Sequence, residues 1–264
     1  MFQLQHFILN PSLDLSKFEN SLFSSFIFSE ENIRQSTINI PENFMLGKQA
    51  EFLFESYLNV SKRYNIIASN IQIQGATETL GEIDYLVKDT LLHKTLHIEL
   101  ACKFYLFDGS QKDRFAKWIG PNRKDSLQEK VDKLTTKQFP ILYKDETKPV
   151  LDKYGLNSSG IEQQLCLKAF LFIPEELKKD GFTSAFQKCI VGYWVNYNVL
   201  QLESNASYYI PSKREWLQPI ASIKHWLDAK NAQKTISQSI SEKRSPLVYK
   251  KTAQNVEQFF VVWW

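Results

Sequence analysis

The periodicity of apolar residues between positions 44 and 173 constrains the fold more than any other feature of the chain. Two segments space their apolar residues as an amphipathic helix does, and four segments alternate or run continuously apolar, as strands do. The expected elements are a helix over 44–60, strands over 65–74, 81–87 and 97–106, a helix over 123–138 and a strand over 166–173. This order is typical of an α/β fold in which helices flank a mixed central sheet.

The second and third of these strands carry acidic residues and a lysine. They are joined by the short connector KDTLLHKT, which predicts an antiparallel hairpin. The third strand, HIELACKFYL, has one wholly apolar face, and its other face carries Glu99 and Lys103. Directly opposed residues of a hairpin point to the same face, and the connector places Asp84 opposite a position between Glu99 and Lys103. We therefore expect these three side chains to converge on one patch.

This patch has the chemistry of a phosphodiester-cleaving site. Two carboxylates on neighbouring strands repel each other unless a cation lies between them. Mg²⁺, or Mn²⁺ in its place, suits such a position because it takes oxygen ligands and keeps several waters. Lys103 would then hold the phosphate or offset charge in the transition state. The alternative is a solvated ion pair across an exposed sheet face, which contributes little.

The motifs resemble those of the PD-(D/E)XK nuclease superfamily. The helix segment LGKQAEFLFESYL precedes GEIDYLV, which is followed by the strand with the acid and the lysine. At a finer level, HIELACKFYL, WIGPNRKD and KQFPIL are similar to the bacterial family named domain of unknown function 1853, over most of the chain. The resemblance implies a restriction-endonuclease-like αβββαβ core with N- and C-terminal elaborations. It also implies Mg²⁺-dependent hydrolysis of nucleic acid, with no established substrate.

The resemblance assigns roles to particular residues. Glu51 matches the acid on the first helix, Asp84 matches the first strand acid, and Lys103 matches the motif lysine, so that Asp84, Glu99 and Glu51 would hold the metal. The second acid usually stands two residues before the lysine, where this chain has Ala101. Glu99 stands two positions earlier, roughly 7 Å along the strand. Either the metal site has shifted toward Asp84 and Glu51, or catalysis is lost and the protein is a nucleic-acid- or partner-binding module.

A basic segment follows the acidic strand. Residues 111–144 contain nine Lys or Arg and four Asp or Glu, whereas the whole chain carries a formal charge of +3. Basic residues interleaved with aromatic ones suit a nucleic-acid backbone, and the alternative is a solvated, lysine-rich helix face. The candidate nucleic-acid contacts are Trp118, Arg123, Lys124, Lys130 and Gln138. The last two lie near the apolar stripe of the second helix, so they are either satisfied structurally or face the site.

Length and composition favour one elaborated domain. The 264 residues, 43 % of them hydrophobic, are enough for a large core, with a nuclease-like part over 42–175 and an extension over 176–264. No apolar run approaches the ~18 residues of a membrane helix, and the N-terminus lacks the pattern of a signal peptide. The three scattered cysteines are expected to be buried thiols, which favours a cytoplasmic protein.

The remaining features carry weaker expectations. The closing FFVVWW predicts a last strand that completes or edges a sheet, and its apolar surface is a candidate homodimer contact. Residues 228–254 are polar and lysine-rich, which predicts a surface helix and a mobile loop. His97 shares the face of the acids, where a structural or surface role is expected. Trp216 is expected to be a packing residue.

Overall fold

The computed structural model describes residues 2–18, 24–29 and 37–264, so parts of the predicted N-terminal elaboration lie outside the described residues. The chain divides into two compact units. Unit 1 comprises Met1–Pro41, Gly47–Cys102 and Glu129–Lys168, and unit 2 comprises Glu42–Leu46, Lys103–Gln128 and Ala169–Trp264. The described residues contain a mixed sheet of ten strands with flanking helices, which confirms the α/β class.

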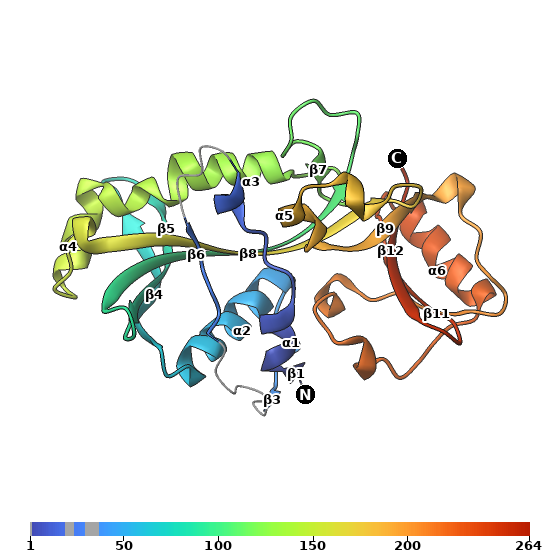
Figure 1. The fold of residues 1–264 in the computed structure, drawn as a ribbon, viewed down its shortest axis with the longest axis horizontal. Helices are drawn as coiled ribbons and strands as arrows, with labels where there is room; N and C mark the ends of the chain where they lie inside the picture. Colours follow the sequence, from blue (N-terminus) through green and yellow to red (C-terminus); the bar gives the residue numbers. More distant parts are fainter. Residues whose placement is uncertain (1, 19–23, 30–36) are drawn as a thin grey trace. The chain divides into compact units, whose positions relative to one another are not determined.

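Unit 1 contains the predicted order of helix, three strands, helix and strand. The elements are α2 (Leu46–Val60), β4 (Tyr64–Gln74), β5 (Thr79–Asp89), β6 (Lys94–Phe107), α3 (Leu127–Lys133) and β8 (Ile161–Pro174). β4, β5 and β6 pair antiparallel in sequence order, and β8 is the next strand beside β6. The strands β6 and β8 also supply residues to unit 2. Figure 1 shows α2 on one face of the unit 1 strands and α3, with α4 (Lys148–Asp152), on the other.

Helix α2 forms where the apolar spacing predicts it. Leu53, Phe54 and Tyr57 lie on one face, and none of them is exposed to solvent. The ring of Phe54 meets the ring of Tyr85 edge-on, with centroids 5.1 Å apart. The Tyr85 hydroxyl donates a hydrogen bond to the carbonyl of Glu51 at 3.2 Å. These contacts fix α2 against the strand that also carries Asp84.

The β5–β6 hairpin has the predicted antiparallel pairing, but only the second half of β5, from Tyr85 to Asp89, pairs with β6. The register runs from Asp89 opposite Lys94 to Tyr85 opposite Ile98. Beyond Tyr85, β5 continues to pair with β4 on its other side. The next position of the hairpin therefore has Asp84 facing Glu99 without a backbone ladder between them. This separation is what opens a polar site at the end of the hairpin.

The second helix ends at Gln138, as predicted, but it begins later than predicted and its last turn is wider than that of an α-helix. It was expected to begin at residue 123, but α3 begins at Leu127, because the preceding residues form a turn in which Gly120 donates from its backbone to the Asp125 carbonyl at 2.7 Å. After Lys133 the helix continues as a π-helical segment, η2 (Leu134–Gln138). The spacing of apolar residues reveals the helix but gives no sign of the wider turn at its end.

Short N-terminal elements complete unit 1. They are β1 (Phe2–Gln3), α1 (Leu4–Leu9), β2 (Ser24–Ser25) and β3 (Thr37–Ile38). Lys168 on β8 is fully buried, and its Nζ donates to the carbonyls of Ile8 and Asn10 at 3.0 and 2.8 Å. The same ammonium lies 4.2 Å from the centre of the Phe28 ring. A buried cation thus attaches the N-terminal segment to the central strand.

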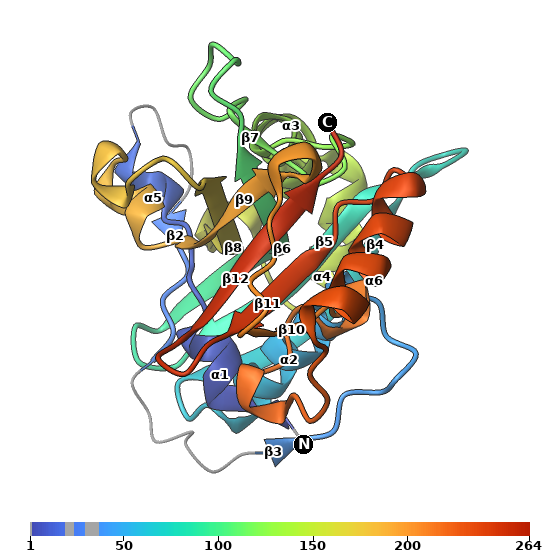
Figure 2. The same cartoon turned by 90° about the vertical axis from the view of Figure 1, so that its right-hand side faces the viewer.

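Unit 2 is built on the C-terminal strands. Its further elements are β7 (Trp118–Ile119), α5 (Ser184–Gln187), β9 (Ile190–Asn196), β10 (Ser207–Tyr209), α6 (Ala229–Ser241), β11 (Leu247–Lys251) and β12 (Val256–Val262). β12 lies between β9, to which it is parallel, and β11, to which it is antiparallel. Figure 2 shows these three strands side by side, with α6 beside them. Ala232 and Ile236 of α6 pack into the same apolar cluster as Val248 and Phe259.

Two expectations about the C-terminus are corrected. The polar stretch 228–254 was expected to end in a mobile loop, but after α6 it forms β11, because its apolar residues pair with β12. The first four residues of FFVVWW do lie in a strand, β12, as predicted, and Trp263 and Trp264 follow it. It is an inner strand, however, and Phe259 to Val262 are at most 2 % exposed, so they offer no surface for a dimer. Trp216 packs on the rings of Phe104 and Phe260, as predicted.

Candidate active site

The candidate site in unit 1 begins where β5 and β6 separate. Asp84 is half-buried, and its Oδ2 accepts a hydrogen bond from the backbone N–H of Leu100 at 2.8 Å. The Asp84 side chain thus replaces the missing strand partner of Leu100. On the opposite strand, Glu99 is completely buried. The structure therefore places Asp84 beside Glu99, at one end of the range from Glu99 to Lys103 in which its partner was expected.

Glu99 is held by a network of neutral donors. His97 Nε2 lies 2.8 Å from Glu99 Oε1, and Gln138 Nε2 donates to Glu99 Oε2. Gln163 Nε2 contacts His97 Nδ1 at 3.0 Å and the carbonyl of Phe139 at 2.8 Å. Because an amide nitrogen can only donate, Nδ1 of His97 must accept and its Nε2 must carry the proton given to Glu99. A neutral His97 therefore orients the buried carboxylate.

A lysine on the helix approaches the same network. Lys130 Nζ donates to Gln138 Oε1 at 2.7 Å, and Gln138 continues the chain to Glu99. Two α-helical turns hold about seven residues, so residues eight apart would point in different directions on a regular helix. The π-helical turn of η2 takes up one additional residue and brings Lys130 and Gln138 into line. The irregular turn is thus what connects the lysine to the acidic site.

The electrostatics of the site are dominated by its acids. Burial raises the pKa of Asp84, the negative charge of Glu99 raises it further, and the result is a value of about 7. The N–H of Leu100 and the charge of Lys130 act in the opposite direction, which places Lys130 close enough to be felt at Asp84. Asp84 therefore exchanges its proton near neutral pH, and any cation that binds there would favour the ionised form.

The acid on α2 is related to this site through the effect of its charge on Glu82. Glu51 forms an ion pair with Lys48 at 2.7 Å, and its side chain is 37 % exposed. Burial raises the pKa of Glu82, and the negative charges of Glu51 and Glu99 raise it further, whereas Lys48 lowers it. Glu51 and Glu82 therefore extend the negative potential of the Asp84–Glu99 pair toward the helix.

Other predicted site residues lie in unit 2. Lys103 is bound to Asp125 at 2.7 Å, so its charge already has a carboxylate partner. Arg123 contacts Asp108 at 3.0 Å and lies over the Trp264 ring, and Lys124 is exposed. The predicted basic segment is thus divided, because residues up to Gln128 belong to unit 2 and the following ones to unit 1.

The prediction that Trp118 contacts nucleic acid must be corrected. Trp118 is 1 % exposed, because β7 pairs with β6 and turns the indole into the interior of unit 2. Its ring packs against Phe107, Phe182 and Phe186. No face of the indole is left on which a base could stack.

The oxygen atoms that could bind a metal ion at Asp84 suit a divalent ion that keeps several waters better than an ion fully enclosed by protein ligands. Within the described parts of the chain, no three His, Cys, Asp or Glu side chains are grouped to hold a metal. Mg²⁺ in proteins commonly uses one or two carboxylates and several waters. The bond from Leu100 uses only Oδ2 of Asp84, and the negative charge that Glu99 adds at this position favours a cation there. Glu99 would supply charge from the interior rather than a ligand oxygen.

Two members of the network carried little or no signal in the sequence. His97 shares a strand face with Glu99, so alternation could have placed it in the site, although a structural or surface role was expected. Gln163 comes from β8 and reaches His97 across 66 residues of chain. Nothing in its local sequence distinguishes it from any other strand glutamine.

The fold and site define a mixed α/β protein with a carboxylate pair at the open end of a β-hairpin. The chain belongs to the family described as Domain of unknown function (DUF1853), whose model matches residues 29–262. Neither the curated proteins nor the solved structures contain a match to the chain. Among the described residues, no helix combines the length and apolarity needed to cross a bilayer.

Proposed function

We propose that the protein is a metal-dependent nuclease of the PD-(D/E)XK type that hydrolyses phosphodiester bonds in nucleic acid. The observation that carries this proposal is the juxtaposition of Asp84 and Glu99 where the hairpin opens, with Lys130 joined to the pair through Gln138. A structural ion pair would place a cation directly on the acids. Here the direct partners of Glu99 are neutral, and the acidic charge remains available to a metal ion.

Each residue has a distinct role in the proposal. Asp84 is the direct carboxylate ligand, and Glu99 strengthens the negative potential from the interior. A Mg²⁺ ion bound there would polarise a phosphoryl oxygen. Lys130 contacts the phosphate and offsets its charge, in place of Lys103, because the ammonium of Lys103 is engaged by Asp125. Glu51 assists from the rim of the site.

Calorimetric titration with Mg²⁺ and Mn²⁺, alone and with an oligonucleotide present, tests the metal site. The native protein should bind the ion, and Asp84→Asn should abolish binding because one neutral amide replaces the direct ligand. Asp152→Asn is the matched control, since this exposed acid lies on α4 in the same unit. Absence of binding by the native protein under both conditions would refute the metal site.

Cleavage of labelled single- and double-stranded DNA and RNA tests the reaction itself. The proposal requires metal-dependent cleavage that is lost in Asp84→Asn and reduced at least tenfold in Lys130→Met. Lys103→Met should have a smaller effect than Lys130→Met. The reverse order would show that the strand lysine, as in the usual motif, acts at the phosphate.

A second candidate function is nucleic-acid or partner binding without catalysis. It is favoured by one observation: Glu99 is completely buried and both its oxygens accept hydrogen bonds within the protein. Under this alternative, Asp84→Asn would keep salt-sensitive binding to nucleic acid, and the native protein would not cleave any of the four substrates. Measuring binding and cleavage on the same samples separates the two functions.

A further inference from the structure

Unit 2 contains a cavity of about 270 Å³ that the proposed nuclease chemistry does not use. It opens on the β9–β12–β11 face and is bounded by the loop that follows the short helix η7 (Tyr197–Val199). The residues that give it its chemistry are Glu175, Tyr193, Glu203, Tyr208, Lys250 and Phe259. All of them belong to unit 2, so the cavity is complete within one compact unit.

The floor of the cavity is a pair of stacked aromatic rings. Tyr193 on β9 and Phe259 on β12 are register partners, and their rings are parallel, with 3° between the planes and 5.0 Å between the centroids. Phe259 is 2 % exposed, whereas Tyr193 is half-buried and turns one face toward the cavity. The free face of Tyr193 provides an apolar surface with the negative potential that attracts organic cations, and Phe259 supports it from the interior.

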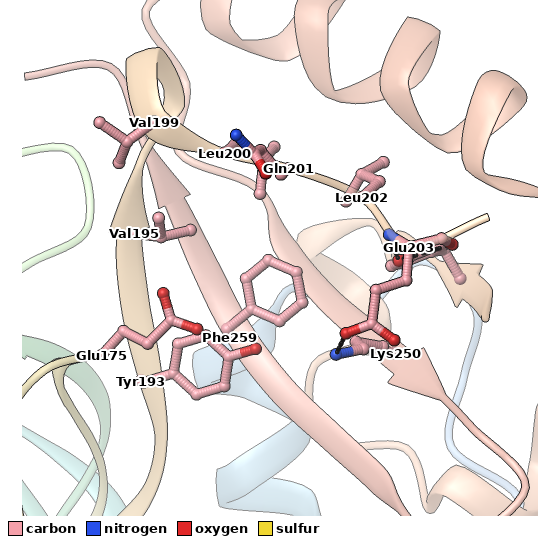
Figure 3. Close-up of a pocket in the computed structure, with 11 residues that line it drawn as sticks. Glu175, Tyr193, Val195, Val199, Leu200, Gln201, Leu202, Glu203, Lys250 and Phe259 are labelled. Atoms are coloured by element: carbon pink, nitrogen blue, oxygen red, sulfur yellow. Dashed lines mark hydrogen bonds and ion pairs between the residues drawn. The ribbon is translucent and has the colours of Figure 1, made fainter. Parts of the chain in front are cut away.

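Two carboxylates flank this floor. Figure 3 shows Glu175 and Glu203 on opposite sides of the two rings. Lys250 donates to Glu203 Oε1 at 2.6 Å, which leaves Oε2 for another donor. Among the described residues, no side-chain hydrogen bond or ion pair engages Glu175. The cavity therefore has two acids and one lysine, and its net charge is negative.

The electrostatic environment of Tyr193 supports a negative net charge in the cavity. Burial raises the pKa of the Tyr193 hydroxyl, and the carboxylates of Glu257, Glu175 and Glu203 all act in the same direction. The negative charges of these three carboxylates therefore act together on the Tyr193 hydroxyl in the floor of the cavity. An anion such as a phosphate group would be repelled from this cavity.

The wall that carries Glu203 is fixed in place. The hydroxyl of Tyr208, which is completely buried, accepts from the backbone N–H of Glu203 at 2.7 Å and donates to its carbonyl at 3.2 Å. Both backbone groups of Glu203 are thus held by one buried side chain. A preformed wall lowers the entropic cost of binding a ligand.

We infer that this cavity binds a linear aliphatic diamine or polyamine. One ammonium group would be placed at Glu175 and the other at Glu203 Oε2, and the methylene chain would lie across the ring of Tyr193. Each part of the ligand then meets a group of matching chemistry, because ammonium groups only donate and the floor is apolar. The inference is independent of the nuclease site in unit 1.

Calorimetry on the full-length protein tests the inference with a series of diamines from 1,3-diaminopropane to 1,6-diaminohexane, and with spermidine. We expect saturable binding with an affinity maximum at one chain length, because the two ammonium groups of the ligand must reach both acids at once. Glu175→Gln and Glu203→Gln should each weaken binding about threefold to fivefold. Glu176→Gln, a neighbouring exposed acid outside the cavity, should leave binding unchanged.

Single-headed amines provide the decisive comparison. n-Butylamine and N-acetyl-lysine amide, which stands for a lysine of another protein, should bind more weakly than the best diamine. Equal binding of a single-headed amine would overturn the inference, as would the absence of saturable diamine binding. The inference would also be overturned if three variants bound the best diamine with equal affinity: Glu175→Gln, Glu203→Gln and the control Glu176→Gln.

Discussion

Asp84 has a carboxylate whose ionisation is opposed by its surroundings. Burial and the nearby charge of Glu99 raise its pKa from 3.8 to about 7, although Leu100 donates a hydrogen bond to it. In the unfolded chain the same carboxyl ionises near its ordinary pKa. As the pH rises from about 4 to 7, the folded chain keeps a proton that the unfolded chain has lost, so the free energy of unfolding falls.

Asp84→Asn should therefore stabilise the protein at alkaline pH. The amide oxygen can still accept from Leu100, and the cost of ionisation, on the order of 4 kcal/mol, disappears. Urea unfolding at pH 8 should show a higher midpoint for the variant than for the native protein. The difference should shrink as the pH is lowered and vanish near pH 4. An equal midpoint at pH 8 would contradict the raised pKa.

Asp89→Asn is the matched control on the same strand. Burial would raise the pKa of Asp89, but the hydrogen-bonded guanidinium of Arg63, at 2.7 Å, lowers it below its usual value. A lowered pKa stabilises the fold above the unfolded pKa, and this contribution is lost as the pH falls through the folded value. The substitution should thus destabilise the protein at pH 8, which is the opposite sign to Asp84→Asn.

The sequence predicted part of the site and not the rest, for a physical reason. Alternation and a short connector are local signals, and they were sufficient to bring Asp84 and Glu99 together. The partner of Lys103 is Asp125, which stands 22 positions away in a turn after β7. Gln163 is more distant still. Side-chain partners that meet only through the tertiary fold leave no local pattern, so the predicted role of Lys103 could not account for Asp125.

At the level of elements, the π-helical turn of η2 links helix geometry to the site. It brings Lys130 and Gln138 into line although they are eight residues apart. Within η2, Thr136 is exposed and its hydroxyl donates to the carbonyl of Asp132 at 2.7 Å, a bond that competes with regular helix pairing. The extra residue of the wide turn can therefore be removed at Thr136 without loss of a buried side chain.

Deletion of Thr136 should be tolerated, because Lys130 and Gln138 would then be seven residues apart on a regular helix, about two turns. Insertion of one alanine after Thr136 should instead rotate Gln138 away from Lys130 and Glu99. We expect the insertion to lower the unfolding free energy by about 2 kcal/mol or more, since buried Glu99 loses a donor. Circular dichroism and urea unfolding of the deletion and the insertion variants test this difference in stability. Equal destabilisation by both changes would contradict it.

The predicted elements show where periodicity succeeds and where it fails. Long amphipathic or apolar segments such as α2, β6 and β8 were placed correctly, because each buries a continuous set of side chains. β11 was missed, since its five residues LVYKK lie in a lysine-rich stretch and gain their apolar partners only from β12. Short strands depend on neighbours that are distant in sequence, and local composition does not reveal them.

At the level of the whole molecule, the chain passes repeatedly between the two compact units. Residues 103–128 leave unit 1 for unit 2, the chain returns over 129–168, and it enters unit 2 again at Ala169. Neither unit is therefore a continuous stretch of sequence. A boundary near residue 175, which the nuclease-like core suggested, would separate residues 103–128 from most of the unit to which they belong.

A fragment of residues 1–175 should consequently fail to fold cooperatively. It would retain β7 with Trp118 but lose Phe182 and Phe186, against which that indole packs, and β8 would lose its parallel partner β9. Exposure of these apolar surfaces should cause aggregation, which size-exclusion chromatography and thermal unfolding will detect. The control is full-length protein cut by trypsin in the exposed segment at Lys112 or Arg114, where no described strand is interrupted. The cut protein should elute and unfold like the intact one. A cooperative transition of the fragment would contradict the prediction, because it would show that residues 1–175 fold without the remainder of unit 2.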